Sequence, residues 1–241
     1  MSNFKSKSTG YDTVRKTQKA LYLESGISAN DFEGLINLFS PEVLAKYLGL
    51  NYSEIEEIPS SKKEIETAGL LNFKSKTIYV SNQFPLNQRR LTGMHELAHW
   101  MLHKNAGLKT MHRDRTISHL PKEGSINYIE WEATNVACQY LMPEKLVRNK
   151  FSELFRLPIG VALEFDETVA FHLGKDIDEL RKMDNFKRAL IVSKAQSFGY
   201  HIIPLHQQFK ISPTAMAIRL LELNLLAPDR HRGRPSLRII R

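Results

Sequence analysis

The run His95-Glu96-Leu97-Ala98-His99 constrains this chain more than any other feature of its sequence. It lies within residues 88–103, whose apolar side chains recur at helical spacing. Residues four apart on a helix point within about 40° of one another, so both imidazoles can reach one metal ion from successive turns. Imidazole nitrogen is a common zinc ligand, and a carboxylate beside the first ligand is placed to accept a proton from an activated water. The pattern therefore predicts a metal-binding helix with Glu96 as general base.

A third protein ligand must come from elsewhere in the chain, because catalytic zinc usually has three protein ligands and a water. The extended motif with a glycine and a third histidine after His99 is absent, since Leu102 and Asn105 occupy those positions. His103 is a poor third ligand, because eight residues of helix span about 12 Å. Two roles stay open for His103, namely support beside the ligands or simple helix packing.

Two carboxylates on the next predicted helix, over residues 126–140, are candidates for the third ligand. Glu130 and Glu132 lie on opposite sides of its apolar stripe, each roughly 75–80° from the centre at about 100° per residue. Periodicity alone does not choose between them.

The segment from Glu132 to Ala137, followed by Leu141-Met142-Pro143, resembles the ImmA/IrrE family of metallo-endopeptidases when taken with LTGMHELAHWMLH at 91–103. The resemblance covers about residues 40–150. It implies that Glu132 is the third metal ligand beside His95 and His99. The chain departs from the family pattern where it carries the residues Thr134, Val136 and Tyr140.

The resemblance also implies fold and function. We expect an α+β chain, with a small zincin-like metalloprotease domain of helices and a short antiparallel sheet, followed by a mainly helical C-terminal domain. The expected activity is metal-dependent hydrolysis of a peptide bond in a protein, with Zn²⁺ or another divalent metal such as Mn²⁺. The implied substrate is a helix-turn-helix transcriptional repressor, in a bacterial stress response or in a phage or mobile-element switch. The alternative is a non-catalytic DNA- or protein-binding regulator with a structural metal.

Composition and the family resemblance together predict four regions. Residues 1–25 read as a loose arm, 26–150 as the metallopeptidase domain, 151–226 as the helical domain and 227–241 as a basic disordered tail. Local signals add three elements to the second region. A helix should begin at Ser40-Pro41, two strands should lie within residues 69–82, and a polar basic loop should cover residues 104–124.

Several further residues carry weaker hypotheses. The strand at residues 77–81 could pair with an extended substrate or be a covered core strand. Cys138 is expected to be a small buried thiol. The side chains that could stabilise an oxyanion, if they are not merely solvated, are Tyr128, His112, Arg113 and His119. The histidines without comparable spacing, expected to be structural or exposed, are His172, His201, His206 and His231.

The net charge of +8 is concentrated in two places. Residues 86–150 hold ten Lys and Arg against six Asp and Glu, and residues 227–241 hold five against one. The tail is therefore the best place for weak, salt-sensitive contact with nucleic acid. Residues 203–226 resemble a helix-turn-helix-like element, but its second helix offers mainly Arg219 for contacts with bases, which favours packing or repressor docking.

The expected location is the cytoplasm. A single cysteine cannot form an intrachain disulfide, and no apolar run follows the polar N-terminus. No stretch approaches the roughly 20 consecutive apolar residues of a membrane-spanning helix. We therefore expect no membrane partner.

Overall fold

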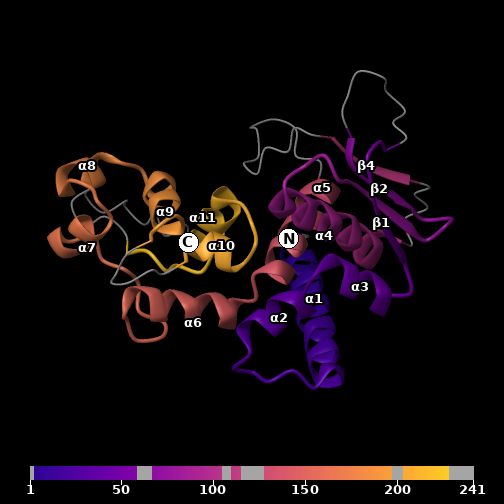
Figure 1. The fold of residues 1–241 in the computed structure, drawn as a ribbon, viewed down its shortest axis with the longest axis horizontal. Helices are drawn as coiled ribbons and strands as arrows, with labels where there is room; N and C mark the ends of the chain where they lie inside the picture. Colours follow the sequence, from indigo (N-terminus) through magenta and orange to yellow (C-terminus); the bar gives the residue numbers. More distant parts are fainter. Residues whose placement is uncertain (1–2, 59–66, 105–109, 115–127, 197–202, 228–241) are drawn as a thin grey trace, which may run out of the picture. The chain divides into compact units, whose positions relative to one another are not determined.

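The computed structural model describes residues 3–58, 67–104, 110–114, 128–196 and 203–227. The chain divides into two compact units. Unit 1 is Met1–Pro143 with Phe209–Ile211, and unit 2 is Glu144–Gln208 with Ser212–Arg241. Unit 1 combines helices with a sheet and unit 2 is mainly helical, which confirms the α+β expectation (Figure 1).

The part of unit 1 that the structure describes contains a four-stranded sheet. Its strands, in the spatial order β1-β3-β2-β4, are β1 (Asn51–Ile55), β3 (Thr77–Ser81), β2 (Thr67–Asn72) and β4 (Thr110–Asp114). The predicted hairpin is present, and its turn includes Lys76 with a φ of 52°. The sheet is mixed where a purely antiparallel one was expected, because the hairpin returns β3 alongside β1 in the same direction.

The position of β3 decides its role. This strand pairs with β1 on one side and β2 on the other, so its backbone is occupied and it is the covered core strand. β4 lies inside the segment that was expected to be a loop, where it pairs antiparallel with β2. A short edge strand of polar residues carries no clear alternation, which explains why the sequence did not indicate it.

Among the described residues of unit 1, five helices accompany the sheet, with the bounds α1 (Asn3–Ser25), α2 (Phe32–Leu38), α3 (Pro41–Tyr47), α4 (Leu86–His103) and α5 (Tyr128–Leu141). The helix that contains the histidine motif, α4, contacts α3, α5 and the two central strands. The predicted start of α3 is confirmed, because the Ser40 side chain accepts a hydrogen bond from the Val43 N–H. Gly49 follows that helix with a φ of 69°, a conformation that glycine adopts without strain.

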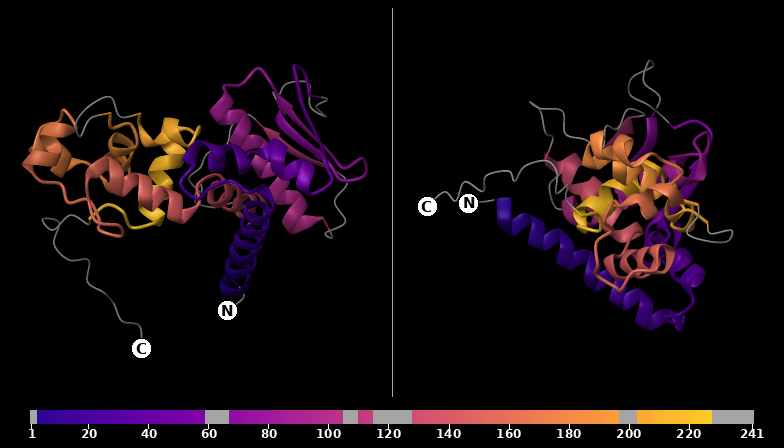
Figure 2. Two further views of the ribbon diagram at one scale, coloured as in Figure 1. Left: turned by 60° about the horizontal axis from the view of Figure 1, so that its bottom comes forward. Right: turned by 90° about the vertical axis from the view of Figure 1, so that its left-hand side faces the viewer.

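The N-terminal region differs from the expected loose arm, because residues 3–25 form one long helix (Figure 2). Val14 and Leu21 are buried on it. A β-carbon added at Gly10 would lie 3.1 Å from Val136 Cγ2, so α1 closely approaches α5. Tertiary packing therefore stabilises a helix whose Ser, Thr and Lys content gives a weak local signal.

Unit 2 contains six helices within its described residues, with the bounds α6 (Glu144–Phe155), α7 (Glu167–His172), α8 (Ile177–Lys182), α9 (Asn185–Ser193), α10 (Leu205–Gln208) and α11 (Pro213–Glu222). Asp166, Asp176, Asp184 and Ser212 each accept a hydrogen bond at a helix start. The expected break between the last two helices is present, although α10 is a single turn. The predicted boundary at residue 150 falls inside α6. None of the described helices combines the length and apolar character needed to cross a bilayer.

Candidate metal centre

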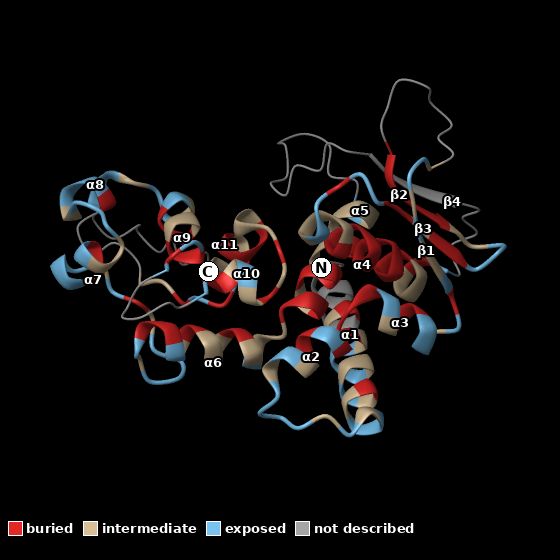
Figure 3. Cartoon of the chain, in the orientation of Figure 1, coloured by how far each residue is buried: buried red, intermediate tan, exposed pale blue. Residues whose placement is uncertain are grey.

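The histidine motif lies on the most deeply buried part of α4. His95 and His99 are each 1% exposed, and Glu96 is fully buried. Figure 3 shows that much of α4 is buried. Histidines and glutamates are seldom buried to this extent unless they are paired or bind a metal. Because these polar side chains are removed from water, they require hydrogen-bond partners or a metal ion.

Three side chains converge at one point between α4 and α5. His95 Nε2 lies 2.9 Å from His99 Nε2 and 3.0 Å from Glu130 Oε2. His99 Nε2 lies 3.3 Å from Glu130 Oε1. Ligands at about 2.0–2.2 Å from a tetrahedral ion are roughly 3.3 Å from one another, so the three donors fit one face of such a site. Two imidazoles and a carboxylate are also a suitable donor set for a divalent metal.

The third donor differs from the one assigned through the family resemblance. Glu132 lies at His103, with Oε2 3.2 Å from His103 Nε2, while Glu130 lies at His95 and His99. Side chains two residues apart on a helix diverge by about 160°, so both carboxylates cannot readily reach one ion. In this arrangement the carboxylate beside both histidines is that of Glu130, and the assignment of Glu132 as third ligand stays a prediction from the resemblance.

Comparison with known families identifies part of the chain. Residues 45–157 match the family model of the IrrE N-terminal-like domain of Peptidase_M78. This stretch of the chain is therefore similar to a Peptidase_M78 domain. The match spans β1 to β4, α4 and α5 and runs through α6, and it confirms the family inferred from the two sequence segments. The match supports a metallopeptidase. No curated protein matches the chain.

Electrostatics at this site favour an ionised carboxylate at Glu130. Burial alone would raise its pKa, but hydrogen bonds to His95 and His99, together with their charge, outweigh burial and hold the pKa well below the usual range. The carboxylate is thus charged at neutral pH, as a metal ligand must be.

The outer nitrogens of both histidines also have partners. Thr134 Oγ1 lies 3.1 Å from His95 Nδ1, and His103 Nδ1 lies 3.1 Å from His99 Nδ1. Thr134 is four residues after Glu130, so one face of α5 contacts both nitrogens of His95. Hydrogen bonds to the outer nitrogen fix the ring orientation and tautomer of a metal-binding histidine. The sequence did not single out Thr134 for this contact.

Gly69 on β2 is a site residue that the sequence patterns did not identify. A β-carbon added there would lie 2.5 Å from Thr92 Cγ2 and 3.0 Å from Glu96 Oε1. The central strand therefore approaches α4 so closely that only glycine leaves room for the expected general base. Its signal in the sequence was a glycine inside a predicted strand, which often marks a close approach.

The remaining candidate residues that the structure describes are not among the three side chains that converge. His206 Nδ1 bonds to the Ser193 carbonyl at 2.9 Å, a structural contact, and Cys138 is buried as expected. Arg219 is buried and lies 3.0 Å from Glu222, which favours the packing role over contact with bases. Tyr128 is partly exposed at the start of α5. His119, His201, His231 and residues 228–241 lie outside the described residues, as do the side chains of His112 and Arg113.

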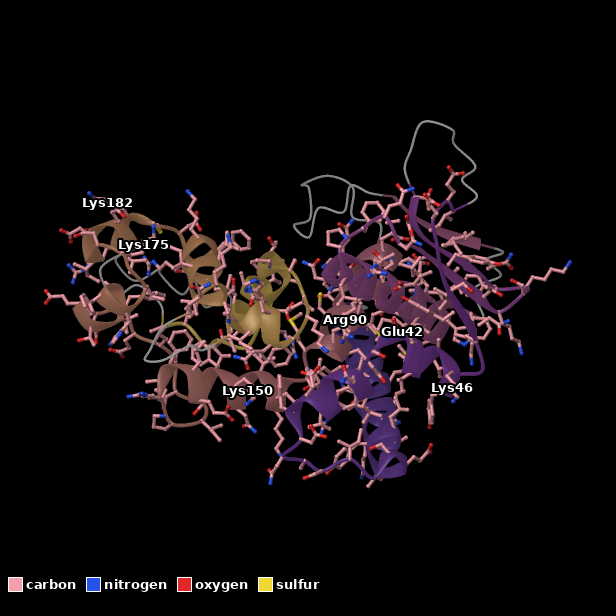
Figure 4. The ribbon with its side chains drawn as sticks, in the orientation of Figure 1. Glu42, Lys46, Arg90, Lys150, Lys175 and Lys182 are labelled. Carbon is pink, nitrogen blue, oxygen red and sulfur yellow. The ribbon has the colours of Figure 1, made fainter. Side chains whose placement is uncertain are left out.

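Arg90, a buried arginine of α4, has a structural role. Arg90 donates from Nη2 to the Ile36 carbonyl at 3.2 Å, and burial lowers its pKa. The carboxylate of Glu42 on α3 partly offsets that effect (Figure 4). This contact ties the first half of α4 to α2, away from the histidines.

Proposed function

We propose that the chain is a zinc-dependent endopeptidase in which His95, His99 and Glu130 hold the metal and Glu96 is the general base. The observation that carries this proposal is the convergence of three ligand atoms, with separations of 2.9–3.3 Å, next to a buried glutamate. The match to the Peptidase_M78 family supports the same reaction class.

The chemistry divides between the metal and one side chain. When bound, a divalent ion supplies Lewis acidity that polarises the scissile carbonyl and acidifies water. Glu96 accepts the proton that water loses as it attacks the carbonyl carbon. The same carboxyl then donates that proton to the departing amine, and the carbonyl–nitrogen bond breaks. Water is consumed and two peptide termini result.

The substrate that we propose is a helix-turn-helix repressor, cleaved in the cytoplasm during a stress response. This part of the proposal rests on the resemblance to the ImmA/IrrE family. Zn²⁺ is the proposed metal, because two imidazoles and one carboxylate are a frequent set of ligands for catalytic zinc. Mn²⁺ is the alternative ion, to be compared in the same assay.

A lysate experiment tests the activity and identifies the substrate together. Purified full-length protein loaded with Zn²⁺ is incubated with a lysate of the source organism, and newly formed N-termini are labelled and identified by mass spectrometry. We expect new termini with the wild type and none with Glu96→Gln. Termini within a helix-turn-helix protein would support the proposed substrate class.

The control is zinc content, which Glu96→Gln should leave unchanged. If the wild type binds Zn²⁺ but produces no new termini, the endopeptidase proposal fails and a regulator with a structural metal replaces it. Equal cleavage by Glu96→Gln would contradict the assigned base.

A further inference from the structure

We propose that His103 and Glu132 form a hydrogen-bonded relay that positions His99 for metal binding. This inference rests on the proposed metal site and assigns a role to two residues outside its ligand set. Both are positioning residues, because they act on the metal only through His99.

The contacts form a continuous line across α4 and α5. His99 Nδ1 lies 3.1 Å from His103 Nδ1, and His103 Nε2 lies 3.2 Å from Glu132 Oε2. His99 is 1% exposed and His103 is 8% exposed, so water competes little for the first contact. The side chain of Glu132 is 16% exposed. The line therefore runs from the metal site toward the protein surface.

Donor and acceptor counting leaves one arrangement of protons for the metal-bound state. A metal at His99 Nε2 uses the lone pair of that nitrogen, so the hydrogen of the neutral ring is on Nδ1. His99 Nδ1 then donates, and His103 Nδ1 must accept. The hydrogen of His103 is consequently on Nε2, which donates to the Glu132 carboxylate. Each contact has one donor and one acceptor.

The relay explains the position of His103 four residues after His99, which metal binding by His95 and His99 alone does not explain. A third histidine eight residues after His95 lies about 12 Å along the helix and is too far to share the ion. It is four residues after His99, so its ring can reach the outer nitrogen of that ligand. His95 has Thr134 in the equivalent position, at 3.1 Å. The two histidine ligands are thus oriented by different partners.

Helix packing is the competing role for His103, and two substitutions separate the roles. His103→Asn keeps an acceptor oxygen near the position of Nδ1, whereas His103→Leu keeps apolar bulk and removes the acceptor. A packing role would tolerate leucine at least as well as asparagine. A relay would tolerate asparagine better.

The first experiment measures Zn²⁺ affinity of the full chain by competition with a chromophoric chelator. His103→Leu should lower the affinity about 10- to 100-fold, the usual cost of losing an outer partner of a ligand. His103→Asn should recover most of that loss, and Glu132→Gln should cost less than Glu132→Ala because the amide still accepts. His206→Leu, which removes a histidine bonded to backbone in unit 2, should leave the affinity unchanged.

Equal Zn²⁺ affinities for His103→Leu and the wild type would overturn the relay while leaving the metal site intact. Equal losses for leucine and asparagine, in variants with unchanged circular dichroism, would also overturn it. Absence of Zn²⁺ binding by the wild type would overturn the proposed metal site and the relay together.

The second experiment needs no variant. Long-range ¹H–¹⁵N spectra of the Zn²⁺-loaded wild type, labelled at histidine nitrogen, report which ring nitrogen carries hydrogen. We expect hydrogen on Nδ1 of His99 and on Nε2 of His103. A His103 ring with hydrogen on Nδ1 would contradict the relay even if every variant failed to fold.

Discussion

Arg188 in unit 2 and the buried histidines in unit 1 have different kinds of partner. In unit 2, Arg188 donates to the carbonyls of Leu180 and Arg181, within eight residues along the sequence. In unit 1, His95 and His103 contact Glu130 and Glu132, which are 35 and 29 residues away. In the first pattern, a side chain of α9 bonds to backbone carbonyls at the end of the neighbouring helix α8. In the second, titratable side chains that are distant in the sequence lie close together.

This difference distinguishes a buried side chain that stabilises the fold from buried side chains that form a functional site. A buried arginine bonded to carbonyls satisfies the ends of helices, and it contributes to stability alone. Buried histidines whose partners are other side chains hold ionisable groups in defined positions, which is an arrangement found at functional sites. Variants in the two units should therefore affect different properties.

The largest expected effect is that of Glu96→Gln. An amide cannot accept the proton, so the rate of cleavage should fall on the order of 10³-fold. Zn²⁺ affinity should stay within a factor of about three, since the ligands are intact. The rate is measured on the protein whose new terminus the lysate experiment identifies. A loss of zinc together with activity would make Glu96 a structural group.

The pair Glu130→Gln and Glu132→Gln compares two carboxylates on one helix. Loss of the charged donor at Glu130 should weaken Zn²⁺ binding by about 100-fold or more, whereas Glu132→Gln retains an acceptor for His103 and should cost less than about 10-fold. Chelator competition measures both. The reverse ranking would restore the assignment drawn from the family resemblance.

Gly69→Ala tests the close approach of β2 to Glu96. The added methyl group would collide with Thr92 and displace the glutamate, so we expect a loss of about 1–3 kcal/mol in unfolding free energy and at least a tenfold fall in the turnover of folded protein. Gly93→Ala is the matched control. Its β-carbon would lie 2.5 Å from the Tyr52 hydroxyl, so stability should fall while turnover per folded molecule is retained.

Arg188→Met probes the structural pattern in unit 2. Removing the guanidinium leaves the Leu180 carbonyl without this donor and should lower the unfolding free energy by about 1–3 kcal/mol. Urea denaturation measures the loss, and Zn²⁺ affinity should not change. A change in Zn²⁺ affinity would contradict the purely structural role of Arg188.

Tyr140→Phe should have the smallest effect at neutral pH. The Tyr140 hydroxyl is buried without a hydrogen-bond partner among the described residues, and burial raises its pKa. Folding therefore favours the protonated phenol, and this contribution is complete below the unfolded pKa of about 10 and is lost at higher pH. The variant should match or slightly exceed wild-type stability at pH 7. Its alkaline unfolding midpoint should shift upward, and a downward shift would contradict the assigned burial effect.

The sequence allowed much of the site to be predicted. Helical periodicity placed both histidines and Glu96 on one helix, and Glu130 and Glu132 on the next. The choice between those carboxylates could not be predicted, because both lie equally far from the apolar stripe of α5. It depends on how that helix approaches α4, which is a tertiary contact.

The same limit applies to the fold. The hairpin of β2 and β3 and the start of α3 have local signals, and both were predicted. The long helix α1 depends on packing of Val14 and Gly10, and β4 depends on pairing with β2. Neither contact has a local signature in the sequence.

The central claim is that His95, His99 and Glu130 bind one metal ion. Anomalous diffraction from crystals of the full chain grown with Zn²⁺, recorded on both sides of the zinc absorption edge, tests it directly. We predict one strong peak about 2.0–2.2 Å from His95 Nε2, His99 Nε2 and a carboxylate oxygen of Glu130, with Glu132 bonded to His103. A peak ligated by Glu132, or no peak between these helices, would contradict the claim.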